Sequence, residues 1–122
     1  MSKPRIRKYG QILAVTFFDR MIDRQTRALS DMVREMAARE NGRLRLLLEI
    51  DTRMPAAGPE QLFESLHFTR LNQDWIDRIA VVGTRAWEET TVGLYGLFGG
   101  VQIEFFDRSR AAEAIRWLQE PS

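Results

Sequence analysis

The only histidine in the chain is His67, so any catalytic triad or histidine metal site would depend on this one residue. Ser65 lies two residues before it and faces elsewhere on the helix predicted there, which is a poor position for a nucleophile. The nucleophile-elbow pattern GxSxG does not occur, and the chain has no cysteine. We therefore predict no catalytic residue and no metal ligand, and we expect a protein that is not an enzyme.

A glycine-rich stretch containing Gly93, Gly96, Gly99 and Gly100 raises the question of a phosphate-binding loop. Neither GxGxxG nor GxxxxGK occurs, and the stretch falls inside a predicted helix instead of between a strand and a helix. We expect the first two glycines to allow another backbone to approach closely or to soften a helix that moves. The sequence therefore predicts no nucleotide and no other cofactor.

Polar residues gather where the predicted parallel strands end. Asp51 and Thr52 follow one strand, Thr84 follows a second, and Asp107 follows a third. Ligands of open α/β sheets favour the crevice beyond the carboxyl ends of the strands, so carboxylates there could serve acid-base or magnesium chemistry. The alternative, which we favour, is that these residues cap helices and turns, because Asp51 has no second acid in a DxD arrangement. Thr52 and Thr84 are candidates for a modification site or an anion site.

Large aromatic side chains fall in or between the second and third predicted helices, at Phe63, Phe68, Trp75, Trp87, Tyr95 and Phe98. A sheet beneath two helices needs large side chains, so we expect most of these residues to be core. The same layer is where an apolar cavity would lie. Phe63, Trp87, Tyr95 and Phe98 are therefore the candidate ligand-binding residues.

The first residues are basic, with Lys3, Arg5, Arg7 and Lys8, although the net charge of the whole chain is only +1. Such a cluster suits an arm that binds nucleic acid or acidic lipid, or a solvated edge strand whose charges block aggregation. We favour the edge strand and expect no nucleic acid partner, because the total charge is small. No apolar run approaches about 18 residues, so we expect a cytoplasmic protein without membrane insertion.

The elements that position these residues follow from the spacing of apolar side chains. A turn after Tyr9 separates the basic segment from the apolar run 12–18, which predicts a β-hairpin. A helix is predicted over 23–40, because apolar pairs recur every four residues and a glycine follows its end. Its inward residues are expected to be Ala28, Leu29, Met32, Val33, Met36 and Ala37.

The rest of the chain alternates between strands and helices. The apolar run 43–51 predicts a strand in the middle of the sheet. Further strands are predicted at 77–83 and 101–106, and helices at 59–71, after Thr84, and at 110–119. The last helix is expected to turn Ala111, Ala114, Ile115 and Leu118 inward. The order ββαβαβαβα predicts a single α/β domain over 1–122, with a mixed, mostly parallel five-stranded sheet, an antiparallel edge strand and about four helices.

Four segments, RLRLLLEID, LFESLHF, DRIAVVGTRAW and IEFFDRSRAAEAIRWL, together resemble the SpoIIAA-like family over about residues 12–118. The most specific parts are 80–87 and the final helix with Ala114, Trp117 and Leu118. The resemblance implies a fold similar to STAS anti-sigma-factor antagonists and CRAL-TRIO lipid-binding domains, and no catalytic residues. STAS antagonists carry a phosphorylatable residue after the central strand, which implies Thr52 as a modification site. Arg53-Met54-Pro55 departs from the usual Ser/Thr-rich turn.

Two functions are compatible with these observations. The first is a non-enzymatic module that holds a small apolar or lipid-like ligand between the second and third helices and the sheet. The alternative is a STAS-type interaction module in which a helix face or an exposed strand edge docks a regulated partner protein. A two-fold homodimer is a further option, because small α/β domains commonly form one.

Overall fold

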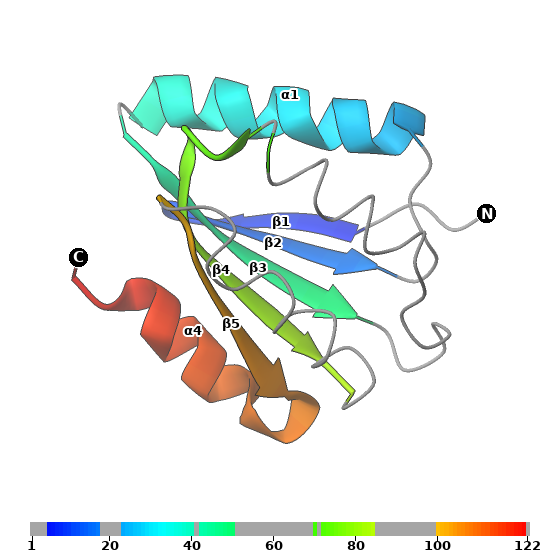
Figure 1. Ribbon diagram of the computed structural model, residues 1–122, viewed down its shortest axis with the longest axis vertical. Coiled ribbons are helices and arrows are strands. Elements are labelled where there is room, and N and C mark those ends of the chain that lie inside the picture. Colours follow the sequence, from blue (N-terminus) through cyan, green and yellow to red (C-terminus); the bar gives the residue numbers. More distant parts are fainter. Residues whose placement is uncertain are drawn as a thin grey trace.

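The computed structural model describes residues 5–17, 23–40, 42–50, 70, 72–84 and 100–121. The described strands are β1 (Arg5–Tyr9), β2 (Ile12–Phe17), β3 (Leu44–Ile50), β4 (Ile76–Gly83) and β5 (Gln102–Asp107). The described helices are α1 (Asp23–Glu40), the 3-10 helix η1 (Arg108–Arg110) and α4 (Ala111–Gln119). The strands form a single sheet, with α1 on one face and α4 on the other (Figure 1).

The five strands lie side by side in chain order, β1-β2-β3-β4-β5. β1 pairs antiparallel with β2, and the other neighbouring pairs are parallel. The predicted mixed sheet, its antiparallel edge strand and the central place of β3 are therefore confirmed. The parallel pairs explain the nearly continuous apolar sequences of β3 and β4, since these strands are covered on both faces.

A tight turn joins β1 to β2, as the sequence predicts. Tyr9 and Ile12 are partners across the ladder, which leaves Gly10 and Gln11 as the two turn residues. Gly10 has a φ of 59°, in the left-handed region that two-residue hairpin turns require. Glycine adopts this conformation without the steric cost that a side chain adds.

Alternation along each strand divides the buried residues into two layers. The larger layer, between the sheet and α1, includes Leu13, Val33 and Leu46. The smaller layer, between the sheet and α4, includes Ile12, Leu47 and Leu118. Because α4 contacts β3, β4 and β5, the β1 end of that sheet face extends beyond this helix.

The described residues contain two α-helices, whereas four were predicted. Their element order is ββαβββα in place of ββαβαβαβα, with η1 before the last helix. The predicted helix at 59–71 lies almost wholly outside the described residues, and the helix after Thr84 lies outside them entirely. The helices predicted at 23–40 and 110–119 are confirmed, the second beginning one residue later at Ala111 after η1.

Two residues predicted to face inward are exposed. Ala28 on α1 and Ile115 on α4 both point toward solvent, and Ile115 retains 41% of its exposure. Ala28 precedes the buried Leu29, and Ile115 follows the buried Ala114. Adjacent residues of a helix point in directions about 100° apart around its axis. A pair of adjacent apolar residues therefore does not show which member faces the sheet.

Candidate functional site

The carboxyl ends of the strands are organised by capping interactions. The Asp107 carboxylate accepts hydrogen bonds from the Ser109 backbone N–H at 3.0 Å and from its hydroxyl at 2.8 Å. These bonds, the backbone bond first, lower the pKa of Asp107, and the nearby Arg108 and Arg110 charges add to the effect. The interpretation of Asp107 as a cap is therefore confirmed.

An arginine spans the same edge of the sheet. Arg108 donates from Nη1 to the backbone carbonyl of Ile50 at 2.8 Å, and so links η1 to the end of β3. Thr84, which immediately follows β4, is half-buried at this edge. Its predicted partner in an anion site, Thr52, lies outside the described residues, so that site stays a prediction.

The candidate apolar ligand site cannot be placed within the described residues. Phe63, Trp87, Tyr95 and Phe98 all lie outside them. The cavity between the second and third helices therefore remains a prediction from the sequence.

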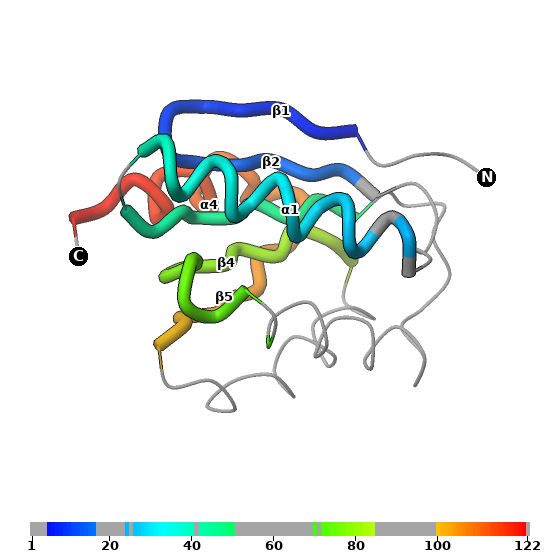
Figure 2. Tube along the Cα trace, turned by 90° about the horizontal axis from the view of Figure 1, so that it is seen from above, coloured from blue at the N-terminus to red at the C-terminus, as the bar shows by residue number. Residues whose placement is uncertain are grey.

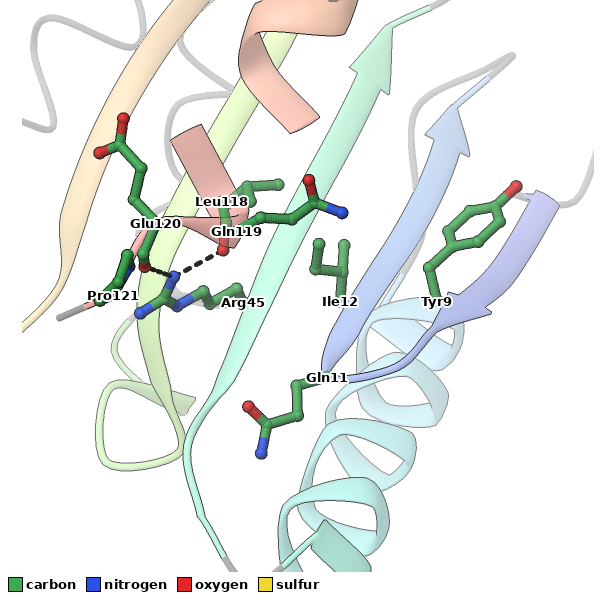
Figure 3. A pocket seen from close by; sticks show the side chains of 8 residues that line it. All are labelled: Tyr9, Gln11, Ile12, Arg45, Leu118, Gln119, Glu120 and Pro121. Carbon is green, nitrogen blue, oxygen red and sulfur yellow. Dashed lines mark hydrogen bonds between the residues drawn. The ribbon is translucent and has the colours of Figure 1, made fainter. Parts of the chain in front are cut away.

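A groove of about 460 Å³ lies at the opposite edge, where the parallel strands begin. It separates the β1–β2 hairpin from the C-terminal end of α4, and Figure 3 shows side chains from both sides around it. Its lining combines an aromatic ring, two side-chain amides, an arginine and several apolar groups. The lining residues are Tyr9, Gln11, Ile12, Arg45, Leu118, Gln119, Glu120 and Pro121.

Arg45 on β3 holds the α4 side of this groove in place. Its Nη1 donates to the carbonyl of Leu118 at 2.6 Å and also to the carbonyl of Glu120, as Figure 3 shows. Its Nε lies 3.3 Å from an Asp77 carboxylate oxygen. The last carbonyls of a helix lack partners within the helix and carry partial negative charge, so a guanidinium stabilises them.

Arg78 on β4 repeats this arrangement beside Arg45, its partner in the parallel ladder. It donates to the carbonyls of Trp117 at 2.6 Å and Pro121 at 3.3 Å. Its guanidinium also lies over the Trp117 ring, 5.3 Å from the centroid. Two largely buried arginines from neighbouring strands therefore fix the last turn of α4 and the residues after it.

The other side of the groove is an exposed edge. All five residues of β1 are exposed, and Tyr9 retains 54% of its surface. The Arg7 guanidinium lies 5.8 Å from the centre of the Tyr9 ring, and also 3.4 Å from a Glu49 carboxylate oxygen. On the opposite face of β1, Lys8 pairs with Glu40 at 3.0 Å.

Sequence reasoning did not find this groove, because its residues come from the hairpin, from β3 and from the end of the last helix. A signal was nevertheless present. Arg45 and Arg78 interrupt two apolar strands at corresponding positions, and a buried arginine needs several acceptors. The acceptors turned out to be the carbonyls that end α4.

Neither a cluster of metal ligands nor a membrane-spanning helix occurs among the described residues. Among them, no three His, Asp or Glu side chains lie where they could hold a metal ion together. None of the described helices is long and apolar enough to cross a membrane.

A mixed five-stranded sheet with α1 and α4 on opposite faces defines an α/β protein whose order of strands in space follows the chain. The SpoIIAA-like family model matches residues 12–119, and the chain belongs to this family. This confirms the resemblance seen in the sequence segments.

A solved structure with a SpoIIAA-like fold, an uncharacterized protein from Shewanella loihica PV-4, is similar to this chain with a TM-score of 0.67. The alignment covers 94% of this chain and 91% of that one, at 16% sequence identity. A likeness at this identity shows the fold alone. No curated protein matches the chain.

Proposed function

We propose that this SpoIIAA-like domain is a non-enzymatic protein-interaction module that engages a partner protein at the groove between the β1–β2 hairpin and the end of α4. The observation that carries the proposal is the position of the groove. It opens directly beside an edge strand whose five residues are all exposed. A partner bound there would contact a shaped hollow and a strand edge at once.

The composition of this surface supports a protein partner. Tyrosine and arginine are enriched at protein interfaces and at the residues that dominate their affinity. Tyr9 and Arg7 lie together at the border of the groove, and the exposed Ile6 adds apolar surface on the other face of β1. These side chains offer a partner both apolar area and hydrogen-bond donors.

The rigidity of the α4 side also supports the proposal. Arg45 and Arg78 already bind the carbonyls of the last turn of α4, so that side of the groove is ordered before any partner arrives. Ordering a loop on binding costs free energy, which a preorganised surface avoids. We propose in addition that binding at the groove regulates the partner, a role that the resemblance to STAS antagonists implies.

Site-specific photo-crosslinking tests the proposed function in the cells that produce the protein. A benzophenone amino acid is placed at Tyr9 or at Gln119, on the two sides of the groove, and at Arg34 on the exposed surface of α1 as the matched control. We expect the same partner of discrete mass from Tyr9 and Gln119 and not from Arg34. Identical adducts at all three positions, or none at the two groove positions, would refute the proposal.

A further inference from the structure

We infer that the partner presents an acidic, extended segment that adds to the sheet as a sixth strand beside β1. The inference rests on the proposed function and specifies the chemistry of the partner. Strand addition of this kind takes its affinity from main-chain hydrogen bonds and its specificity from alternate side chains.

The first observation is the edge itself. Among the described residues, β1 pairs with β2 and with no other strand, and Figure 2 shows it at the margin of the sheet beyond β2. In an antiparallel pair, alternate residues direct their N–H and C=O groups away from the neighbour. An edge strand therefore offers a row of donors and acceptors to an incoming strand.

The second observation is the charge of this edge. β1 carries three Lys or Arg side chains and no Asp or Glu, although the whole chain is nearly neutral. On β1, Arg5 and Arg7 have Thr16 and Ala14 as ladder partners and so lie on the α4 face, while Lys8 lies on the α1 face. An incoming strand would meet positive charge on both of its faces.

The carboxylates that pair with Arg7 and Lys8 leave room for others. Glu49 and Glu40 come from β3 and α1, on the inner side of β1, and the Arg7 and Lys8 side chains remain about half exposed at 45% and 46%. Exposed ion pairs are weak, so an acidic segment can share or replace them at little cost.

A second copy of this chain fits the edge less well. In two-fold antiparallel pairing of β1 with itself, a register centred on Arg5, Arg7 or Lys8 sets that one cation opposite its own copy. A register centred on Ile6 instead sets Arg5 opposite Arg7. Like charges directly opposite each other destabilise a strand pair. Self-pairing therefore opposes like charges in every register centred on a β1 residue except Tyr9, whereas an acidic segment avoids this repulsion in all of them.

The groove supplies the side-chain specificity. Every second residue of an added strand lies on the α4 face, the same face as Tyr9 and the groove. Glutamate or aspartate at those positions would face Arg5 and Arg7. A longer side chain near Tyr9 would reach Gln11 and Gln119 at the border of the groove.

The inference is tested with defined peptides and the whole protein. The probe is a short fluorescein-labelled peptide of alternating glutamate and valine, and its binding is measured by fluorescence anisotropy. A peptide of alternating lysine and valine, and a single-stranded oligonucleotide of equal negative charge, are the comparison probes. Two further versions of the acidic peptide carry N-methyl groups on alternate residues. One version is methylated at the odd-numbered positions, and the other at the even-numbered positions.

We expect the acidic peptide to bind and the lysine peptide not to bind. Methylation in one phase should weaken binding by about tenfold or more and in the other should leave it nearly unchanged, because only alternate amides face β1. Arg5→Gln and Arg7→Gln should each weaken binding by about two- to fivefold, and the α1 control Arg34→Gln should not. Circular dichroism verifies that these surface variants fold.

Equal effects of the two methylation phases, or tighter binding of the oligonucleotide than of the acidic peptide, would overturn the inference. Failure of the acidic peptide to bind while Tyr9 and Gln119 crosslink a partner would overturn the inference and leave the proposed function standing. Peptide binding without any protein crosslink in cells would instead refute the proposed function.

Discussion

Truncation of Leu118 tests whether the end of α4 is packed as the structure shows. Leu118 is 1% exposed and lies in the buried layer with Ile12 and Leu47, at the border of the groove. Ile115 on the same helix has the same number of carbon atoms but is 41% exposed. The two residues are a matched pair, because each loses three carbons on substitution by alanine.

The expected costs differ by a measurable amount. Three buried carbons at about 0.8 kcal/mol each give about 2.4 kcal/mol for Leu118→Ala, and the cavity raises this to about 3 to 4 kcal/mol. For Ile115→Ala, partial exposure reduces the same loss to about 1.4 kcal/mol, and the better helix propensity of alanine offsets about 0.4 kcal/mol of it. The predicted difference is therefore about 2 to 3 kcal/mol.

Urea denaturation followed by circular dichroism measures both variants. In a protein of this size the difference corresponds to a gap in Tm of roughly 8 to 12 °C. Equal losses of stability, or a larger loss for Ile115→Ala, would refute the packing of α4 and would place Ile115 inward, as the sequence pattern first indicates.

Three further predictions concern other described contacts. The pKa of Asp107 is lowered on folding, so its stabilising effect is present above the ordinary aspartate pKa of about 3.9 and is lost as the pH falls through the lowered value. NMR titration should show a low Asp107 midpoint that rises in part in Ser109→Ala, which loses the hydroxyl bond and keeps the backbone bond; an ordinary aspartate midpoint in the unaltered protein would contradict the cap. Gly10→Ala should lower the free energy of unfolding, measured by urea denaturation, by about 1 to 2 kcal/mol. The loss comes from the positive φ alone, because an added Cβ meets no atom within 4 Å. Gly10→Asn should lower the free energy of unfolding by less, because asparagine adopts this conformation more readily. The Asn72 side-chain amide donates to the Ser30 hydroxyl at 3.0 Å in a buried site, so a double-mutant cycle of Ser30→Ala and Asn72→Ala should give a coupling of about 1 kcal/mol, and additive losses would contradict it.

Much of the sheet could be predicted from local signals. The glycine turn between the basic segment and the apolar run 12–18 predicts the hairpin, and the largely apolar sequence of β3 predicts a central strand. The length of α1 follows from a repeat of apolar pairs that ends at a glycine. Each of these signals lies within a few neighbouring residues, which is why sequence reasoning can detect it.

Which residues of each helix face the sheet was harder to predict from the sequence. Ala28 and Ile115 were expected to face the sheet, but their neighbours do so. The choice between two adjacent apolar residues depends on how the helix crosses the strands, and this is a long-range property. The same limit explains the missed groove, which joins the hairpin to the end of α4 across more than one hundred residues of chain.

The contacts of the two buried arginines could not be predicted from the residues next to them in sequence. Arg45 and Arg78 interrupt two largely apolar strands, and both are largely buried against the end of α4. They donate to backbone carbonyls at the end of α4, including the Trp117 carbonyl, which also accepts from the Glu120 N–H. The candidate site therefore depends on tertiary contacts that the strand sequences alone do not reveal.

Hydrogen–deuterium exchange of the protein alone and in complex with its crosslinked partner tests the central claim most directly. Binding of the partner at the groove and at the sheet edge should slow exchange in β1 and at residues 118–120, with exchange in α1 unchanged. Slower exchange confined to α1, with β1 exchanging as in the free protein, would contradict it.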